Sequence, residues 1–70
     1  MSNLRDLRLA ADLTQDYVAQ RLSVDQAAVS NWERGKSPPL RKYRPQLCRI
    51  YNVTPEELEA AINATRKEST

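Results

Sequence analysis

The sequence predicts a small all-α protein, a compact bundle of five short helices in one domain. Apolar residues recur at intervals of three and four along most of the chain, and no stretch shows the alternation of a half-buried strand. Helix-capping residues and prolines stand between these apolar stretches, where short helices would begin or end. With 70 residues, the chain is long enough for one hydrophobic core and too short for two domains.

The first helix is expected to begin after Ser2, its N-cap, and to run to about Ala11. Leu4 and Leu7 lie on one face of this segment at helical spacing. Asp12 then has to end the helix. Glycine or asparagine takes the left-handed conformation at a helix end more readily than aspartate, so we expect a local cost in stability here.

Residues 14–35 are expected to form two short helices joined by a tight turn. Thr14 is the expected N-cap of a helix over about 15–21, and Asp25 is that of a helix over about 26–34. The apolar faces of the two helices comprise Val18, Ala19, Leu22, Ala28, Val29 and Trp32. Two such helices form a helix-turn-helix, the arrangement that places its second helix in the major groove of DNA.

The segment after these two helices begins as a loop. Gly35, the one glycine of the chain, stands where the preceding helix needs a left-handed residue at its end. Two prolines follow within residues 36–39 and exclude a continuing helix. A fourth helix is expected from about Arg44 to Tyr51, because Pro45 fits only in a first turn.

The fifth helix has the clearest start. Thr54 is the expected N-cap, a proline occupies the first helical position, and Glu57 completes a capping box. This helix is expected to end near Asn63. We therefore predict a helix-turn-helix domain over residues 1–63 and a polar, flexible tail over residues 64–70.

The net charge of +2 is small, but the charges are unevenly distributed. Residues 33–49 carry six basic side chains and one acidic side chain, between two more acidic ends. A local basic surface of this kind favours an anionic partner such as nucleic acid. A run of charges is often only a solvated face, and that alternative stays open.

The composition argues against several classes of function. The chain has no histidine and one cysteine, Cys48, so we expect no disulfide, no metal and no other cofactor. We find no nucleophile with a base and no glycine-rich phosphate loop, so an enzyme is not expected. No apolar run approaches the ~20 residues of a membrane span, and the first residues lack the features of a signal peptide. These observations predict a reducing, cytoplasmic location, at the nucleoid if the partner is DNA.

Two segments at a fixed separation, Leu13-Thr14-Gln15 and Trp32-Glu33-Arg34-Gly35-Lys36, resemble those of the Cro/C1-type (XRE-like) helix-turn-helix domain. This family includes phage repressors and small bacterial regulators, and the resemblance covers about residues 4–62. It implies a λ-repressor-like fold of five helices that binds double-stranded operator DNA, usually as a homodimer. It also implies a buried ion pair between Arg8 and Glu33 that fastens the first helix to the third.

The resemblance implies that the exposed face of the third helix contacts bases. The residues of this face are Gln26, Ala27, Ser30 and Asn31. A glutamine can bond adenine N6 and N7 together, an asparagine can do the same if it reaches, and an alanine methyl suits a thymine methyl. The alternative is a polar face that meets only solvent.

Phosphate contacts are expected on either side of this face. The resemblance places Gln15 against a phosphate at the start of the second helix, where backbone amides also favour an anion. The basic run next to the third helix adds further candidates, namely Lys36, Arg41, Lys42, Tyr43 and Arg44. Tyr43 can instead belong to the core.

The sequence departs from the family pattern at four positions. Ser23 stands where the turn usually has glycine, Asp12 where the first helix usually ends in glycine or asparagine, and Tyr17 where a glutamate is common. We expect these three to affect local stability and not function. Pro45 falls inside the family's usual fourth helix, and the shape of that helix depends on it.

The sequence therefore predicts a DNA-binding transcriptional regulator, repressor-like and of the kind found in phage genetic switches. It would read an operator with its third helix. The alternative is a co-repressor, anti-repressor or modulator that binds another phage or bacterial regulator protein and meets DNA only in that complex. The acidic fifth helix and the basic middle segment are the surfaces that such a partner would contact.

Overall fold

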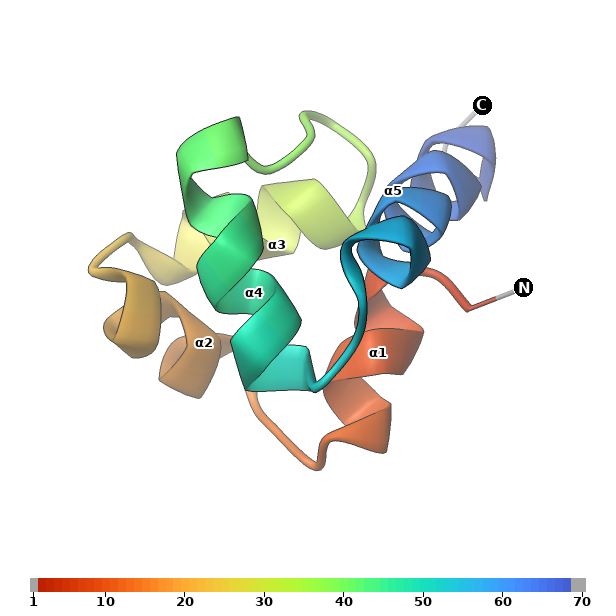
Figure 1. The fold of residues 1–70 in the computed structure, drawn as a ribbon. Coiled ribbons are helices and arrows are strands. Elements are labelled where there is room, and N and C mark those ends of the chain that lie inside the picture. The colour runs from red at the N-terminus through yellow and green to blue at the C-terminus, as the bar shows by residue number, and fades with distance from the viewer. Residues whose placement is uncertain (1, 69–70) are drawn as a thin grey trace.

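The computed structural model describes residues 2–68, and within them the chain is all helical (Figure 1). The predicted all-α fold of five helices is confirmed. A short 3₁₀ turn, η1, directly precedes the fourth helix. The elements in order are α1 (Leu4–Ala10), α2 (Gln15–Leu22), α3 (Gln26–Glu33), η1 (Arg41–Tyr43), α4 (Arg44–Tyr51) and α5 (Pro55–Glu68).

The core lies at the centre of the bundle and takes side chains from all five helices. Val18 and Val29, from α2 and α3, are fully buried, and Leu47 and Leu58, from α4 and α5, are nearly so. In Figure 1, α1 and α5 lie side by side, α2 packs beside α3, and α4 packs on α5. Within residues 2–68 no helix is long and apolar enough to cross a membrane.

The cap of α1 differs from the prediction. Asn3, and not Ser2, is the N-cap. Its side chain accepts a hydrogen bond from the Asp6 amide, and the Asp6 carboxylate accepts one from the Asn3 amide. Asparagine and aspartate thus form the reciprocal capping box that serine and glutamate more commonly form. As a result the helix starts one residue later than it would with Ser2 as the N-cap.

The turn between α2 and α3 follows the prediction in outline. Thr14 caps α2 by accepting a hydrogen bond from the Tyr17 amide, and Ser23 ends the helix in the left-handed conformation. Asp25 occupies the N-cap position of α3 with extended backbone, but its side chain makes no capping hydrogen bond. The predicted position of this cap is therefore right, and its predicted side-chain contact is wrong.

The segment from α3 to α5 contains two features predicted from the sequence, a left-handed Gly35 and a helix start at Pro45. Gly35 is left-handed, with φ of 75°. η1 occupies the three residues before α4, so the chain turns tightly there, and Pro45 lies in the first turn of α4, as predicted. The predicted capping box of α5 also forms, because Thr54 and Glu57 exchange side-chain to backbone hydrogen bonds.

Helix α5 continues through Glu68, beyond the expected end near Asn63. Ala64 and Thr65 are buried, and the Thr65 hydroxyl accepts a hydrogen bond from the Leu4 amide at the start of α1. The expected flexible tail over residues 64–70 is therefore wrong for residues 64–68, because packing against α1 extends the helix. Residues 69–70 lie outside the described residues.

Replacing Ser23 with glycine is expected to raise the free energy of unfolding by about 1 kcal/mol, because a side chain at left-handed φ carries a steric cost that glycine avoids. Ser23 has φ of 57°. Urea denaturation followed by circular dichroism measures the change. Asn52→Gly is the matched control: Asn52 has the same φ, but asparagine tolerates this conformation and should gain less. An unchanged or lowered stability in Ser23→Gly would contradict the expectation.

Candidate nucleic-acid interface

Helix α3 presents a polar face to solvent on the side opposite its buried residues. Gln26 and Ala27 are exposed, and Ser30 and Asn31 are half-buried. Val29 and Trp32, on the other side of the helix, are buried in the core. The four residues predicted to contact bases therefore share one accessible face, and packing of the opposite side holds this face rigidly.

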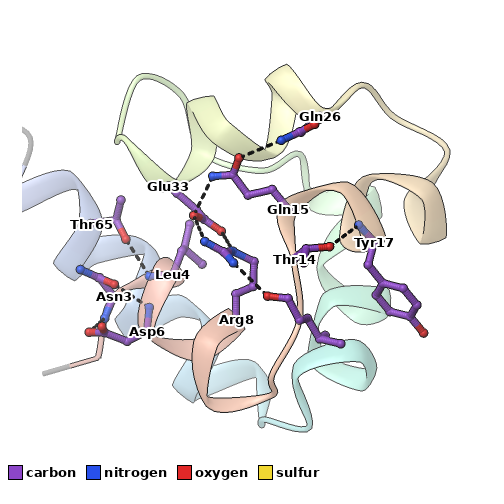
Figure 2. Close-up of polar contacts among 11 residues, drawn as sticks. Asn3, Leu4, Asp6, Arg8, Thr14, Gln15, Tyr17, Gln26, Glu33 and Thr65 are labelled. Carbon is purple, nitrogen blue, oxygen red and sulfur yellow. Dashed lines mark hydrogen bonds and ion pairs between the residues drawn. The ribbon is translucent and has the colours of Figure 1, made fainter.

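A chain of hydrogen bonds anchors the start of this face to the inside of the molecule (Figure 2). Gln26 Nε2 donates to Gln15 Oε1 over 3.4 Å, and Gln15 Nε2 donates to Glu33 Oε1 over 3.0 Å. A carboxylate only accepts hydrogen bonds, so Glu33 fixes which end of the Gln15 amide faces it. Gln15 then presents its oxygen to Gln26, and the Gln26 oxygen and one N–H remain free toward solvent.

Glu33 forms the ion pair with Arg8 that the resemblance to the helix-turn-helix family implied. Arg8 Nε lies 2.6 Å from Glu33 Oε2, and Arg8 Nη2 donates to Glu33 Oε1 over 3.1 Å. The two side chains are 10% and 5% exposed. Arg8 Nη1 also donates to the Leu13 carbonyl over 2.9 Å, so the guanidinium joins α1 to α3 and to the connection before α2.

The electrostatics around this pair favour its charged form. The hydrogen bond to Glu33 raises the pKa of Arg8, and it outweighs burial, which lowers it. Burial raises the pKa of Tyr51, and the nearby charge of Glu33 raises it further. Tyr51, a buried residue of α4 close enough to feel the charges of both partners, is therefore neutral.

Asn31 is the second amide of the face, and it is oriented from its own helix. Arg34 Nη2 donates to Asn31 Oδ1 over 3.0 Å. The two N–H groups of Asn31 stay free for a ligand, and its oxygen has one lone pair left. The two amides on α3 therefore differ, because the Asn31 oxygen already accepts a hydrogen bond whereas Gln26 uses one of its N–H groups and keeps its oxygen free.

The basic side chains after α3 divide into two groups. Lys36, Arg41 and Lys42 are exposed. Arg44 is half-buried and its Nε donates to the Pro39 carbonyl over 3.3 Å. Tyr43 is half-buried against the core, with its ring centroid 5.9 Å from that of Trp32.

These positions bear on the predicted phosphate contacts. Lys42 lies over the Tyr43 ring, with its Nζ 5.1 Å from the centroid, and a cation held in this way is partly ordered before it meets a phosphate. Tyr43 belongs mainly to the core, which is the alternative that the sequence left open. The three exposed cations are accessible to solvent, and their contact with phosphates stays a prediction.

Two hydrogen bonds at this surface were not predicted from the sequence, namely Gln26 to Gln15 and Arg34 to Asn31. Nothing in the spacing of Gln15 and Gln26 indicates that their amides meet, because the contact depends on the crossing of α2 over α3. The pairing of Arg34 with Asn31 was detectable, since residues three apart on a helix are neighbours.

Comparison with known proteins identifies the domain. A family model described as a helix-turn-helix domain matches residues 2–61. A similar protein is the HTH-type transcriptional activator BcrR of Enterococcus faecalis, 36% identical over 55 residues. That match covers 79% of this chain and 27% of the relative, so the chain spans about a quarter of the relative's length. No solved structure gives a match. On its sequence match and its paired helices α2 and α3, the chain belongs to the helix-turn-helix domain family.

Proposed function

We propose that this chain is the sequence-specific DNA-binding domain of a transcription regulator and that α3 enters the major groove. The observation that carries the proposal is the exposed Gln26 amide, held by Gln15 with one acceptor and one donor left free. The helix-turn-helix match and the relative's name as a transcriptional activator support a DNA-binding regulator.

The free atoms of the two amides favour different bases. Gln26 keeps the acceptor and the donor that adenine N6 and N7 require together. Asn31, whose oxygen already accepts a hydrogen bond from Arg34, keeps both N–H groups free and therefore favours a base edge with acceptors, such as guanine O6 and N7 or thymine O4. Ala27 and Ser30 lie between them and complete the contact through a methyl group and a hydroxyl.

Phosphate contacts would come from both ends of α3. The exposed Lys36, Arg41 and Lys42 follow the helix, and the amides at the start of α2 precede it. The second N–H of Gln15 remains available there. Each cation that neutralises a phosphate makes binding more dependent on salt.

We expect two copies to bind a two-fold operator, because one domain of this size contacts few base pairs. Their recognition helices would then lie about 34 Å apart, one helical turn of DNA. Repression follows where such a site overlaps a promoter, as in a phage-type switch. BcrR is described as an activator, and both outcomes use the same contact with DNA.

Selection from a pool of duplexes with a randomised central segment tests the proposal. We expect enrichment of one two-fold motif. Fluorescence anisotropy should then give an affinity at least ~10³-fold above that for scrambled DNA. Four cations per copy, the three exposed ones and Arg44, predict about 10²-fold weaker binding per copy between 50 and 200 mM salt. A pool without an enriched motif, together with equal binding to all duplexes, would overturn the proposal and favour the regulator-binding alternative.

A further inference from the structure

The buried Glu33 lies two hydrogen bonds away from the exposed Gln26 amide that is proposed to contact a base (Figure 2). The side chain of Glu33 is 5% exposed, so it is closed to a ligand itself. Two N–H donors of Arg8 fix its carboxylate in place. Gln15, half-buried at the start of α2, joins this fixed carboxylate to the exposed end of α3.

Each amide in this connection has a direction, because one end of an amide accepts hydrogen bonds and the other end donates them. The Glu33 carboxylate only accepts, so it binds the nitrogen of Gln15 and leaves the Gln15 oxygen facing α3. That oxygen in turn accepts from the nitrogen of Gln26 over 3.4 Å. The reversed orientation of Gln26 would place two oxygens against each other. The acceptor at the buried end therefore favours the orientation in which Gln26 keeps its oxygen free.

We propose that Glu33 is a positioning residue for base recognition, which acts through Gln15 and makes Gln26 select adenine over guanine. In the favoured orientation Gln26 has a free oxygen and one free N–H, which match N6 and N7 of adenine. Guanine presents two acceptors, O6 and N7, at the same edge, so the free oxygen of Gln26 would oppose one of them. The inference rests on the proposed function, because it concerns the base that α3 contacts.

Glu33→Gln reverses the direction of these hydrogen bonds and keeps the shape of the side chain. Arg8 only donates, so the new amide turns its oxygen toward Arg8 Nε, the closer donor at 2.6 Å, and its nitrogen toward Gln15. Gln15 then turns its oxygen inward and its nitrogen toward α3. In response Gln26 turns its oxygen toward Gln15 and offers both N–H groups to the base, as guanine requires.

The size of the effect follows from the strength of one hydrogen bond. A net hydrogen bond changes an equilibrium constant by about fivefold. In the unmodified chain this factor favours adenine, and in Glu33→Gln it favours guanine. The ratio of the affinities for adenine and guanine is therefore expected to fall about 25-fold in Glu33→Gln, as the product of the two factors.

Anisotropy titrations of two duplexes that differ at one base pair measure this ratio. The pair is the one at which Gln26→Ala removes the preference of the unmodified chain. Glu33→Gln also lowers stability, because Arg8 Nη2 loses its acceptor. A smaller folded fraction weakens binding to both duplexes by the same factor, so a purely structural role of Glu33 cannot change the ratio.

Gln15→Met interrupts the connection and leaves the ion pair of Glu33 and Arg8 in place. Neither orientation of the base-contacting amide is then favoured, so the ratio should fall about fivefold. Loss of the predicted phosphate contact of Gln15 should weaken binding to both duplexes alike. Gln20→Met is the matched control on α2, because Gln20 is exposed and donates to Asp16 of its own helix. It should keep the ratio of the unmodified chain.

Nuclear magnetic resonance of the free protein tests the orientation without DNA. Gln15 Nε2 and Arg8 Nη2 donate to the same atom, Glu33 Oε1, over 3.0 and 3.1 Å. Their protons are therefore expected to show nuclear Overhauser contacts in the unmodified chain. These contacts should disappear in Glu33→Gln, where the Gln15 nitrogen faces Gln26 instead.

The outcomes separate the inference from the proposed function. If the unmodified chain prefers adenine and Glu33→Gln keeps the same ratio, the inference is overturned and the proposed function stands. Overhauser contacts that persist in Glu33→Gln would also overturn the inference alone. An unmodified chain that prefers no base at any pair would overturn both proposals. A ratio that falls in Gln15→Met and falls further in Glu33→Gln would support both.

Discussion

Replacing Glu33 with alanine is expected to lower the free energy of unfolding by about 3–5 kcal/mol, because the change strands a buried charge. The Glu33 carboxylate accepts two hydrogen bonds from Arg8 and one from Gln15. Without it, the guanidinium of Arg8 stays in a site that is almost closed to water and keeps only the Leu13 carbonyl as a partner. A domain of this size is typically stable by about 4–10 kcal/mol, so the variant should lose a large part of its stability.

Urea denaturation followed by circular dichroism measures this loss. Glu59→Ala, at an exposed position of α5, is the control for removal of a carboxylate and should change stability by less than about 0.5 kcal/mol. The double variant Arg8→Met with Glu33→Leu should recover most of the loss, since no unpaired charge remains buried. A loss below about 1 kcal/mol in Glu33→Ala would contradict the buried ion pair. Weak DNA binding by this variant would reflect unfolding and not a lost contact.

The parts of the fold that local chemistry determines were predictable from the sequence. Thr54 and Glu57 form a capping box from residues three apart, and Thr14 caps α2 through its own first turn. Pro45 restricts the start of α4 for a steric reason that acts within one turn. Each of these signals lies within a few residues, so no knowledge of the packing was needed.

The parts that failed depend on contacts between distant residues or on a choice between neighbouring caps. Helix α5 extends because Thr65 meets the Leu4 amide, 61 positions away along the chain. Ser2 and Asn3 are both good caps, and Asp6, three residues after Asn3, decides between them. Composition made residues 64–68 appear to be a tail, whereas burial against α1 keeps them helical.

The exposed face of α3 was predictable from the sequence, but the hydrogen bonds that connect this face to the rest of the molecule were not. Helical spacing places Gln26 beside Ser30 and Ala27 beside Asn31, which together form one broad face of α3. The Arg8–Glu33 pair came from resemblance to a family, because residues 25 positions apart give no local signal. The link from Gln26 through Gln15 to Glu33 needed the crossing of two helices. Contact of this face with DNA remains a prediction.

The double variant Gln26→Ala with Asn31→Ala is expected to lose discrimination between the selected motif and scrambled DNA. Each base contact is worth about 1–3 kcal/mol, so the two together predict a loss of about 30-fold to 10⁴-fold per copy on the selected motif. Binding to scrambled DNA should hardly change, because phosphate contacts dominate it. Anisotropy titrations of both duplexes at one salt concentration measure the two effects separately.

Lys36→Ala is the matched control, an exposed cation next to the face. It should weaken binding to both duplexes by a similar factor. It should also reduce the slope of log affinity against log salt concentration by about 1, the value for one lost phosphate contact. Arg34→Ala separates orientation from contact: loss of its bond to Asn31 should relax preference at one base pair without affecting the base read by Gln26. If the double variant bound the selected motif as well as the unmodified chain, α3 would not read DNA. The basic loop and the acidic face of α5 would then be the surfaces on which to look for a regulator protein as partner.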